Sequence, residues 1–391
     1  MRLLSEFLRS IGWMVLCGGT IVVSAGDQTG QVSVGFDAYG GNRELVSEAT
    51  GFFRLQEFAG RHFLVTPYGH GYRALGLNHF HNMTSPDHDG AIDNIREWGF
   101  NAGCYQGPRW MWQRYPYTKG INLVPICQWL PDDRYGYRDV FDPEFLVEMD
   151  EHIRSIVEPQ KNNRMLIGYF WTDIPNWERQ RNGEDWISFY RGLPANSPGG
   201  QAWRHWRNEN ASAPPGDFLA IIARQLYGEA HATLRKYDSN HLILGPRYHE
   251  IDMPEHVVRE VLPYVDALAI QPTSREFNTP FFDEVYAKFG KPIYIADHVS
   301  SFRTADHPIT MGQAADNAAD YSFYYQRYVV TALSQPYMIG YNKCQYQDQM
   351  APDGIMLKQG ILGLDESPYE EIIPAISLGN RQALEAAYRL E

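Results

Sequence analysis

An apolar stretch that ends abruptly in an acid sets the strongest limit on the fold of this chain. Leu166-Ile-Gly-Tyr-Phe170 is a continuous apolar run, the pattern of a strand that is buried on both faces of a parallel sheet. It passes directly into Trp171, Thr172 and Asp173, and Pro175 then interrupts regular structure. A carboxylate therefore emerges where a buried strand stops, which in a (β/α) barrel is the rim that carries catalytic residues.

The same pattern recurs along the chain, and its repetition predicts a barrel. The apolar run Pro292-Ile-Tyr-Ile-Ala296 also ends in an acid, Asp297. Helical stretches such as 217–237 separate most of the predicted strands. The predicted strands are residues 72–81, 99–104, 121–126, 166–171, 241–247, 265–270, 292–297 and 337–341. Alternation of this kind in 391 residues predicts an α/β protein with one (β/α)8 TIM barrel, preceded by a short β-hairpin at 52–65.

The beginning of the chain is typical of an export signal. Arg2 and Arg9 supply positive charge, and the apolar stretch 11–23 is too short to span a bilayer. Val23-Ser-Ala25 offers small residues for cleavage. We therefore predict export to the periplasm or the cell exterior, with no membrane attachment after cleavage. The predicted divisions are residues 1–25 as a signal peptide, 26–50 as a lead-in segment and 51–391 as a catalytic domain.

Composition limits the kinds of partner that the chain can have. The formal net charge of −13 argues against nucleic acid and against anionic membrane surfaces. Beyond the predicted signal only Cys104, Cys127 and Cys344 remain, which does not make a disulfide framework. Aromatic residues make up 14% of the chain, and aromatic clusters beside strand-end acids suit the stacking of sugar rings. The sequence leaves the oligomeric state open.

Several short motifs follow one another in an order that is informative in combination. They are Gly51-Phe-Phe-Arg-Leu55, Gly60-Arg-His-Phe-Leu-Val65, Pro67-Tyr-Gly-His-Gly71, Leu75-Gly-Leu-Asn-His79, Asp139-Val-Phe-Asp-Pro-Glu-Phe145, Leu166-Ile-Gly-Tyr-Phe170, Gln345-Tyr-Gln-Asp348 and Gly363-Leu-Asp-Glu-Ser-Pro-Tyr369. Over residues 51–380 this set resembles agarase-like glycoside hydrolases of clan A. The resemblance implies a (β/α)8 barrel with an acid/base on strand four and a nucleophile on strand seven. It also implies a galactose-containing carbohydrate substrate, of the agar, carrageenan or porphyran type, and no metal or organic cofactor.

The chain departs from this family at the residues that carry the chemistry. Clan A usually has Asn-Glu at the end of strand four and Glu at the end of strand seven, where this chain has Thr172-Asp173 and Asp297. We predict Asp173 as the general acid and Asp297 as the base or nucleophile. Each Asp is shorter by one C–C bond, about 1.5 Å, so a retaining separation of about 5–5.5 Å could open toward the inverting range of about 6.5–9.5 Å. In the structural alternative, Asp173 caps the following turn and Asp297 pairs with Arg303.

Further residues at strand ends and in the aromatic loops 105–117 and 171–206 are candidates for substrate binding. Polar side chains there can hydrogen-bond sugar hydroxyls, and indoles can stack on sugar rings. The candidates are Asn78, His79, His81, Trp110, Trp112, Trp171, Trp177, Arg247, Tyr248, Gln271, His298, Gln345 and Gln347. Each alone is equally well explained by a structural role, but their shared location at one rim favours the functional interpretation.

Two other functions remain open at this point. Asn78-His-Phe-His81 places two imidazoles at a strand end, as metal-dependent amidohydrolases do, but strands four and six then offer Thr172-Asp173 and Gln271 where that class needs Lys and His. A barrel that binds glycans without cleaving them is the other alternative, because both usual Glu residues are absent. Metal analysis tests the first alternative, and an Asp173→Asn comparison tests the second.

Overall fold

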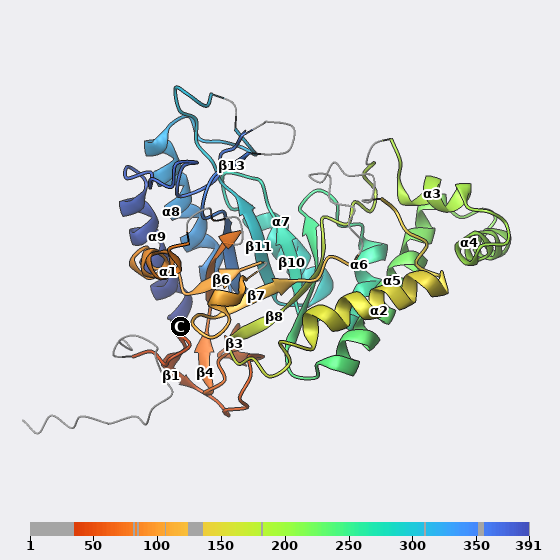
Figure 1. Cartoon of the computed structure of the whole chain (residues 1–391), viewed down its shortest axis with the longest axis horizontal. Helices are drawn as coiled ribbons and strands as arrows, with labels where there is room; N and C mark the ends of the chain where they lie inside the picture. Colours follow the sequence, from red (N-terminus) through yellow and green to blue (C-terminus); the bar gives the residue numbers. More distant parts are fainter. Residues whose placement is uncertain are drawn as a thin grey trace, which may run out of the picture. The chain divides into compact units, whose positions relative to one another are not determined.

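In a computed structural model, eight parallel strands close into a barrel and confirm the predicted fold (Figure 1). The structure describes residues 35–80, 83, 86–105, 107–123, 136–180, 183–308, 310–350 and 356–390. The barrel strands are β5 (Ala74–Asn78), β6 (Ala102–Cys104), β7 (Tyr117–Gly120), β8 (Leu166–Asp173), β9 (Leu242–His249), β10 (Leu268–Gln271), β11 (Ile293–Val299) and β12 (Met338–Cys344). They follow one another around the barrel in chain order, and β12 closes it against β5.

Helices follow most of the barrel strands along the chain. They are α1 (His88–Glu97), α2 (Pro143–Val157), α3 (Trp186–Gly192), α4 (Pro198–Glu209), α5 (Phe218–Tyr237), α6 (Glu255–Val261), α7 (Thr279–Phe289), α8 (Ala318–Ser334) and α9 (Ile373–Tyr388). The start of α2 matches its prediction, because Asp142 accepts a hydrogen bond from the Glu144 amide and Pro143 occupies the first turn. No helix in the described part of the chain is long and apolar enough to cross a membrane.

A small antiparallel sheet lies at the end of the barrel where the strands begin. It consists of β1 (Asn42–Val46), β4 (His70–Tyr72), β3 (Arg61–Val65) and β2 (Arg54–Phe58), in that order. The predicted hairpin is thereby confirmed as β2–β3, whereas β1 forms within the stretch predicted as an irregular lead-in. The His62 amide of β3 donates to the carbonyl of Pro336, which lies just before β12. This hydrogen bond attaches the small sheet, drawn in red to orange in Figure 1, to the end of the barrel where the strands begin. The opposite end is therefore left for the strand-end polar residues.

The position predicted for the third barrel strand was wrong. That strand is β7, whereas residues 121–123 follow it as irregular backbone and 124–126 lie outside the described residues. The prediction assigned Tyr117 to the aromatic loop 105–117 and preferred the apolar run 121–126 as the strand. Tyr117 and Thr118 favour strands, however, and Thr118 pairs opposite Gly168 of β8.

The core contains two clusters of buried residues, and β8 contributes to both. On β8, Ile167 and Phe170 belong to a smaller cluster with Tyr294, composed mainly of residues that face the barrel interior. Leu166 and Tyr169 of the same strand belong to the larger cluster between barrel and helices. Both faces of β8 are therefore buried, as its continuous apolar sequence predicts.

Close contact between β8 and β9 leaves no room for a side chain at Gly168. A Cβ on Gly168 would stand 2.5 Å from the Leu242 carbonyl oxygen, an atom of the neighbouring backbone. We expect Gly168→Ala to lower the free energy of unfolding by about 1–3 kcal/mol, measured by urea denaturation. Gly216→Ala is the control, because nothing lies within 4 Å of the added methyl. Equal losses in both variants would contradict this explanation.

Candidate active site

The two acids predicted from strand ends meet at one arginine. Asp173 ends β8, the fourth barrel strand, and Asp297 lies on β11, the seventh. The Arg247 Nη2 atom lies 2.8 Å from Asp173 Oδ1, and its Nη1 atom lies 3.3 Å from Asp297 Oδ2. A single guanidinium thus contacts both carboxylates, so the two acids lie close enough together to act on one glycosidic bond.

Asp297 is the more enclosed acid of the pair, with 9% of its side chain exposed against 20% for Asp173. The Asn78 Nδ2 donates to its Oδ1 over 2.6 Å, and His79 Nε2 lies 3.6 Å from its Oδ2. Burial alone raises the pKa of Asp297, but the nearby His79 and Arg247 outweigh it and lower the pKa to about 2. Asp297 is therefore an ionised carboxylate at ordinary pH.

Two neighbouring side chains contact Asp173 at its Oδ1 atom. The Gln271 Nε2 donates to Asp173 Oδ1 over 2.7 Å and also to the Arg247 carbonyl over 3.2 Å. Gln271 ends β10, the sixth strand, so residues from strands four, five and six are linked here.

Two residues of this site escaped the sequence-based prediction. The Arg247 guanidinium lies 3.5 Å from the ring centroid of Tyr105, and the Tyr105 hydroxyl donates to Asn122 Oδ1 over 3.0 Å. Tyr105 follows directly after β6, so the rule that strand ends carry site residues could have found it. Cys344, the last residue of β12, interacts with Asp297 and was considered only as a potential disulfide partner.

Two of the predicted sugar-stacking indoles lie in the outer core instead of the barrel mouth. Trp171 stacks on Tyr227 with ring centroids 5.1 Å apart, and Trp177 stacks on Trp186 at 5.5 Å. Both are fully enclosed, at 0% and 1% exposure. Tyr248 is fully buried as well. These three side chains pack the barrel against α3 and α5.

Replacement of Trp177 separates packing from substrate binding. We expect Trp177→Phe to lower the free energy of unfolding by about 1–3 kcal/mol, because a smaller ring leaves a void against Trp186. Glycan affinity of the folded fraction should stay within about twofold of the wild type, since the indole is only 1% exposed. Denaturation and affinity electrophoresis in glycan gels provide the two measurements. A large loss of affinity with unchanged stability would restore the stacking interpretation.

His298 follows Asp297 on β11 but is directed into the core. Its Nδ1 lies 2.8 Å from the Tyr341 hydroxyl and its Nε2 lies 3.0 Å from the Ser274 carbonyl. Its ring stacks on Tyr328 at 3.7 Å. Burial lowers the pKa of His298 to about 3, so the ring is neutral and donates to Ser274 while it accepts from Tyr341.

The structure places the remaining substrate-binding candidates in different surroundings. Trp110 stacks on His88 of α1 at 4.7 Å. Gln345 and Gln347 follow β12 and are buried, and Gln345 Oε1 accepts from Gln349 over 3.0 Å. His81 lies outside the described residues. The alternative pairing of Asp297 with Arg303 is not seen, because Arg303 pairs with Asp316.

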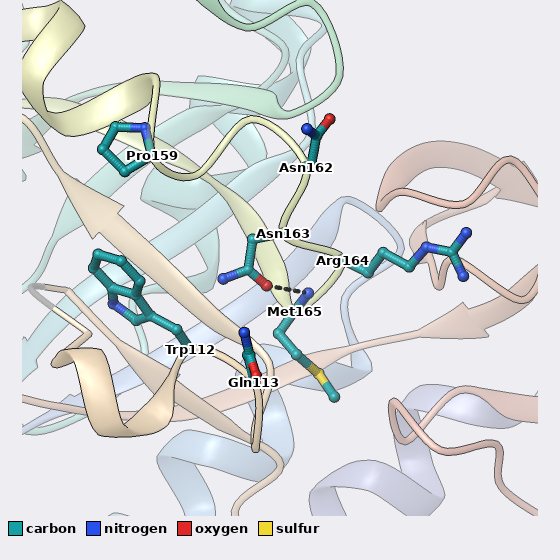
Figure 2. Close-up of a pocket in the computed structure, with 7 residues that line it drawn as sticks. All are labelled: Trp112, Gln113, Pro159, Asn162, Asn163, Arg164 and Met165. Atoms are coloured by element: carbon teal, nitrogen blue, oxygen red, sulfur yellow. Dashed lines mark hydrogen bonds between the residues drawn. The ribbon is translucent and has the colours of Figure 1, made fainter. Parts of the chain in front are cut away.

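Trp112 lies in a hollow at the opposite end of the barrel. Figure 2 shows it with Asn163, Arg164 and Met165, which come just before β8 or at its start. The Trp112 indole donates to the Gly107 carbonyl over 2.8 Å. The hollow measures about 410 Å³, but the acids lie at the other end of β8. It is therefore separate from the candidate active site.

Known proteins share this sequence pattern and this barrel. The beta-agarase B of Vibrio sp. (strain JT0107) is 21% identical, over 77% of this chain and 36% of that protein. The agarase AgWH50C superposes with a TM-score of 0.76 at 18% identity, covering 91% of this chain and 67% of that chain. An exo-beta-agarase superposes with a TM-score of 0.77 at 18% identity, covering 92% and 69%. The resemblance to agarase-like glycosidases is confirmed.

These similarities establish the fold, and the site has to be argued from its own residues. No protein-family model matches the chain. The chain spans about a third of the length of the curated agarase, 36%. What the chain shares with solved agarases at 18% identity is the barrel.

Proposed function

We propose that this protein is a glycoside hydrolase that cleaves an agar-type, galactose-containing glycan with Asp173 and Asp297. The observation that carries the proposal is the meeting of strand-four and strand-seven carboxylates at the Arg247 guanidinium. Most glycoside hydrolases use a pair of carboxyl groups that flank the glycosidic bond. The similarity to a beta-agarase and to solved agarases supports the choice of glycan.

The environments of the two acids suit different roles. Asp297 stays ionised because its pKa is lowered to about 2, so it can stabilise the positive charge of the transition state and either attack the anomeric carbon or activate a water. Asp173 is more exposed, which suits the general acid that must reach the departing glycosidic oxygen. The proton then passes from Asp173 to the leaving sugar, and water supplies the new anomeric hydroxyl. The second proton of that water goes to Asp297 if water attacks directly, or to Asp173 if Asp297 has attacked first.

Substrate and location are part of the same proposal. We infer that the chain acts outside the cytoplasm, on the basis of the N-terminal pattern of charge, apolar stretch and small residues. Arg247 contacts both acids and is fully buried, so other residues must recognise sulfate or sugar hydroxyls.

Reducing-sugar release from agar, porphyran, carrageenan and plant galactan fragments tests the activity. We expect release from at least one galactan of red-algal type. NMR of the first anomer released then distinguishes direct attack by Asp297, which retains configuration, from attack by water, which inverts it. No release from any glycan, with binding retained in affinity gels, would favour the non-catalytic barrel.

The metal-dependent amidohydrolase remains the weaker candidate. The described ends of strands five and six place Arg247 and Gln271 at the acid pair, and neither side chain is a usual metal ligand. A guanidinium that bridges both acids also opposes a pair of metal ions there. The glycosidase interpretation uses these two side chains, whereas the amidohydrolase interpretation leaves them unexplained.

A further inference from the structure

We propose that His79, Asp297 and Cys344 form a binding site for one zinc-type divalent cation, and that this cation blocks the glycosidase site. The three residues come from the ends of strands one, seven and eight. Their ligand atoms, an imidazole nitrogen, a carboxylate oxygen and a thiol sulfur, all lie within 4.8 Å of one another. Imidazole, thiolate and carboxylate are the ligands that zinc prefers in proteins.

The spacing of His79 and Asp297 is close to that of two ligands of one zinc ion. Their closest nitrogen and oxygen atoms are 3.6 Å apart, beyond normal hydrogen-bond length. Ligand atoms bound tetrahedrally to one zinc at about 2.0–2.3 Å are separated by roughly 3.3–3.7 Å. The wider limit of 4.8 Å for the whole group requires a contraction of only about 1 Å on binding.

The backbone of His79 supports a functional role for its orientation. Its φ angle is 65°, in the left-handed region that residues other than glycine rarely adopt. Such local strain persists where the surrounding structure holds a side chain in a required direction. Here it directs the imidazole toward Asp297, while 18% of the side chain stays exposed. A cation can therefore enter from the His79 side.

The charges around the group suit one divalent ion. With a Cys344 thiolate, the two acids carry three negative charges, which balance the Arg247 guanidinium and one divalent zinc ion. Coordination of the Cys344 sulfur to a divalent cation releases the thiol proton to solvent. Magnesium and calcium prefer oxygen ligands, so the imidazole and the thiol select zinc.

A buried oxygen beside Asp297 offers a further point of attachment. Asn78 is fully buried, and its Nδ2 contacts Asp297. Its Oδ1, at the other end of the same amide, accepts no hydrogen bond from the residues that the structure describes. A water bound to the cation can supply the missing donor. The Asn78 amide would then hold both Asp297 and the water of the metal.

Occupation of this site is incompatible with the proposed catalysis. An Asp297 oxygen that ligates zinc is no longer available to the anomeric carbon, so zinc and substrate compete. This consequence rests on the proposed function, whereas zinc binding itself does not.

Calorimetric titration of the metal-free full chain with zinc chloride tests the site without any substrate. We expect one tight site per chain in the wild type and more than about tenfold weaker binding in Cys344→Ser and in His79→Gln. Cys104→Ser is the matched control, because Cys104 is also a buried, free cysteine of the barrel but lies outside the group. Cobalt(II) in place of zinc should give a thiolate charge-transfer band that Cys344→Ser lacks.

The outcomes separate this proposal from the proposed function. Equal zinc affinity in Cys344→Ser and Cys104→Ser, with both variants folded by circular dichroism, would overturn the site, as would no binding to the wild type. If galactan hydrolysis is detected, zinc should inhibit the wild type competitively and inhibit Cys344→Ser at least about tenfold less, each relative to its own zinc-free rate. If no hydrolysis is detected, the titration alone decides the metal site.

Discussion

The kcat of the Asp173→Asn variant on agar-type oligosaccharides should be about 10²- to 10⁴-fold lower than that of the wild type. This is the range attributed to general acid–base catalysis. The amide keeps the size of the side chain but has no acidic proton to give to the leaving oxygen. On an aryl galactoside with a strongly acidic phenol, which departs without protonation, the loss should be much smaller. Initial rates on both substrates therefore test the acid role of Asp173 specifically.

The Asp297→Asn variant should lose activity on both kinds of substrate. An ionised carboxylate at the anomeric centre is needed whatever the leaving group, and the amide carries no charge. Asp252→Asn is the matched control, because Asp252 is also buried but accepts from the Trp177 and Glu178 amides instead of contacting the acid pair. Activity that survives both active-site changes would show that the strand-end acids are structural.

The acids were predictable from sequence because their signal is local. A buried strand that stops at a carboxylate can be recognised from an apolar run and the polar residue that ends it. Both Asp173 and Asp297 have this signal. Placing them on strands four and seven of one barrel then brings them to the same rim. The same reasoning placed Arg247 and Gln271 at that rim, although their roles were assigned to substrate instead of to the acids.

The indoles were misplaced because the path of a strand depends on its neighbours. Period-two alternation places Trp171 and Asp173 on the same face of β8. The pairing with β9 shifts register between Phe170 and Asp173, so Trp171 turns into the outer core while Asp173 faces Arg247. Such an irregularity is set by contacts between strands. It leaves no mark in the sequence of β8 alone.

The bridge made by Arg247 could not be predicted for a similar reason. Its guanidinium reaches Asp297 from a strand two positions away around the barrel, and this depends on barrel closure. Sequence identifies an arginine at a strand end, a residue that is usually exposed. Complete burial of Arg247 is acceptable only because two carboxylates surround it.

Arg247→Met should therefore destabilise the protein more than the same substitution at a solvent-exposed arginine. Methionine fills a similar volume but leaves the buried carboxylates without their shared cation, and we expect a loss of about 3–5 kcal/mol in the free energy of unfolding at pH 7. Arg303→Met is the control, because Arg303 forms an exposed pair with Asp316 and should cost at most about 1 kcal/mol. Urea denaturation in chelator-containing buffer gives both values.

The pH dependence of that loss identifies its origin. In the wild type the pKa of Asp297 falls from an ordinary 3.8 to about 2, so this acid stabilises the fold above pH 4 and loses that contribution between about pH 4 and 2. Without Arg247 one of the causes that lower this pKa is gone, and burial raises it. In the variant, Asp297 therefore takes up a proton at a higher pH than in the wild type, and this removes its unpaired buried charge. The difference in the free energy of unfolding between the two proteins should be largest at neutral pH and shrink toward pH 4. A difference that stays constant with pH would mean that Arg247 acts through packing, and that the two carboxylates do not depend on its charge.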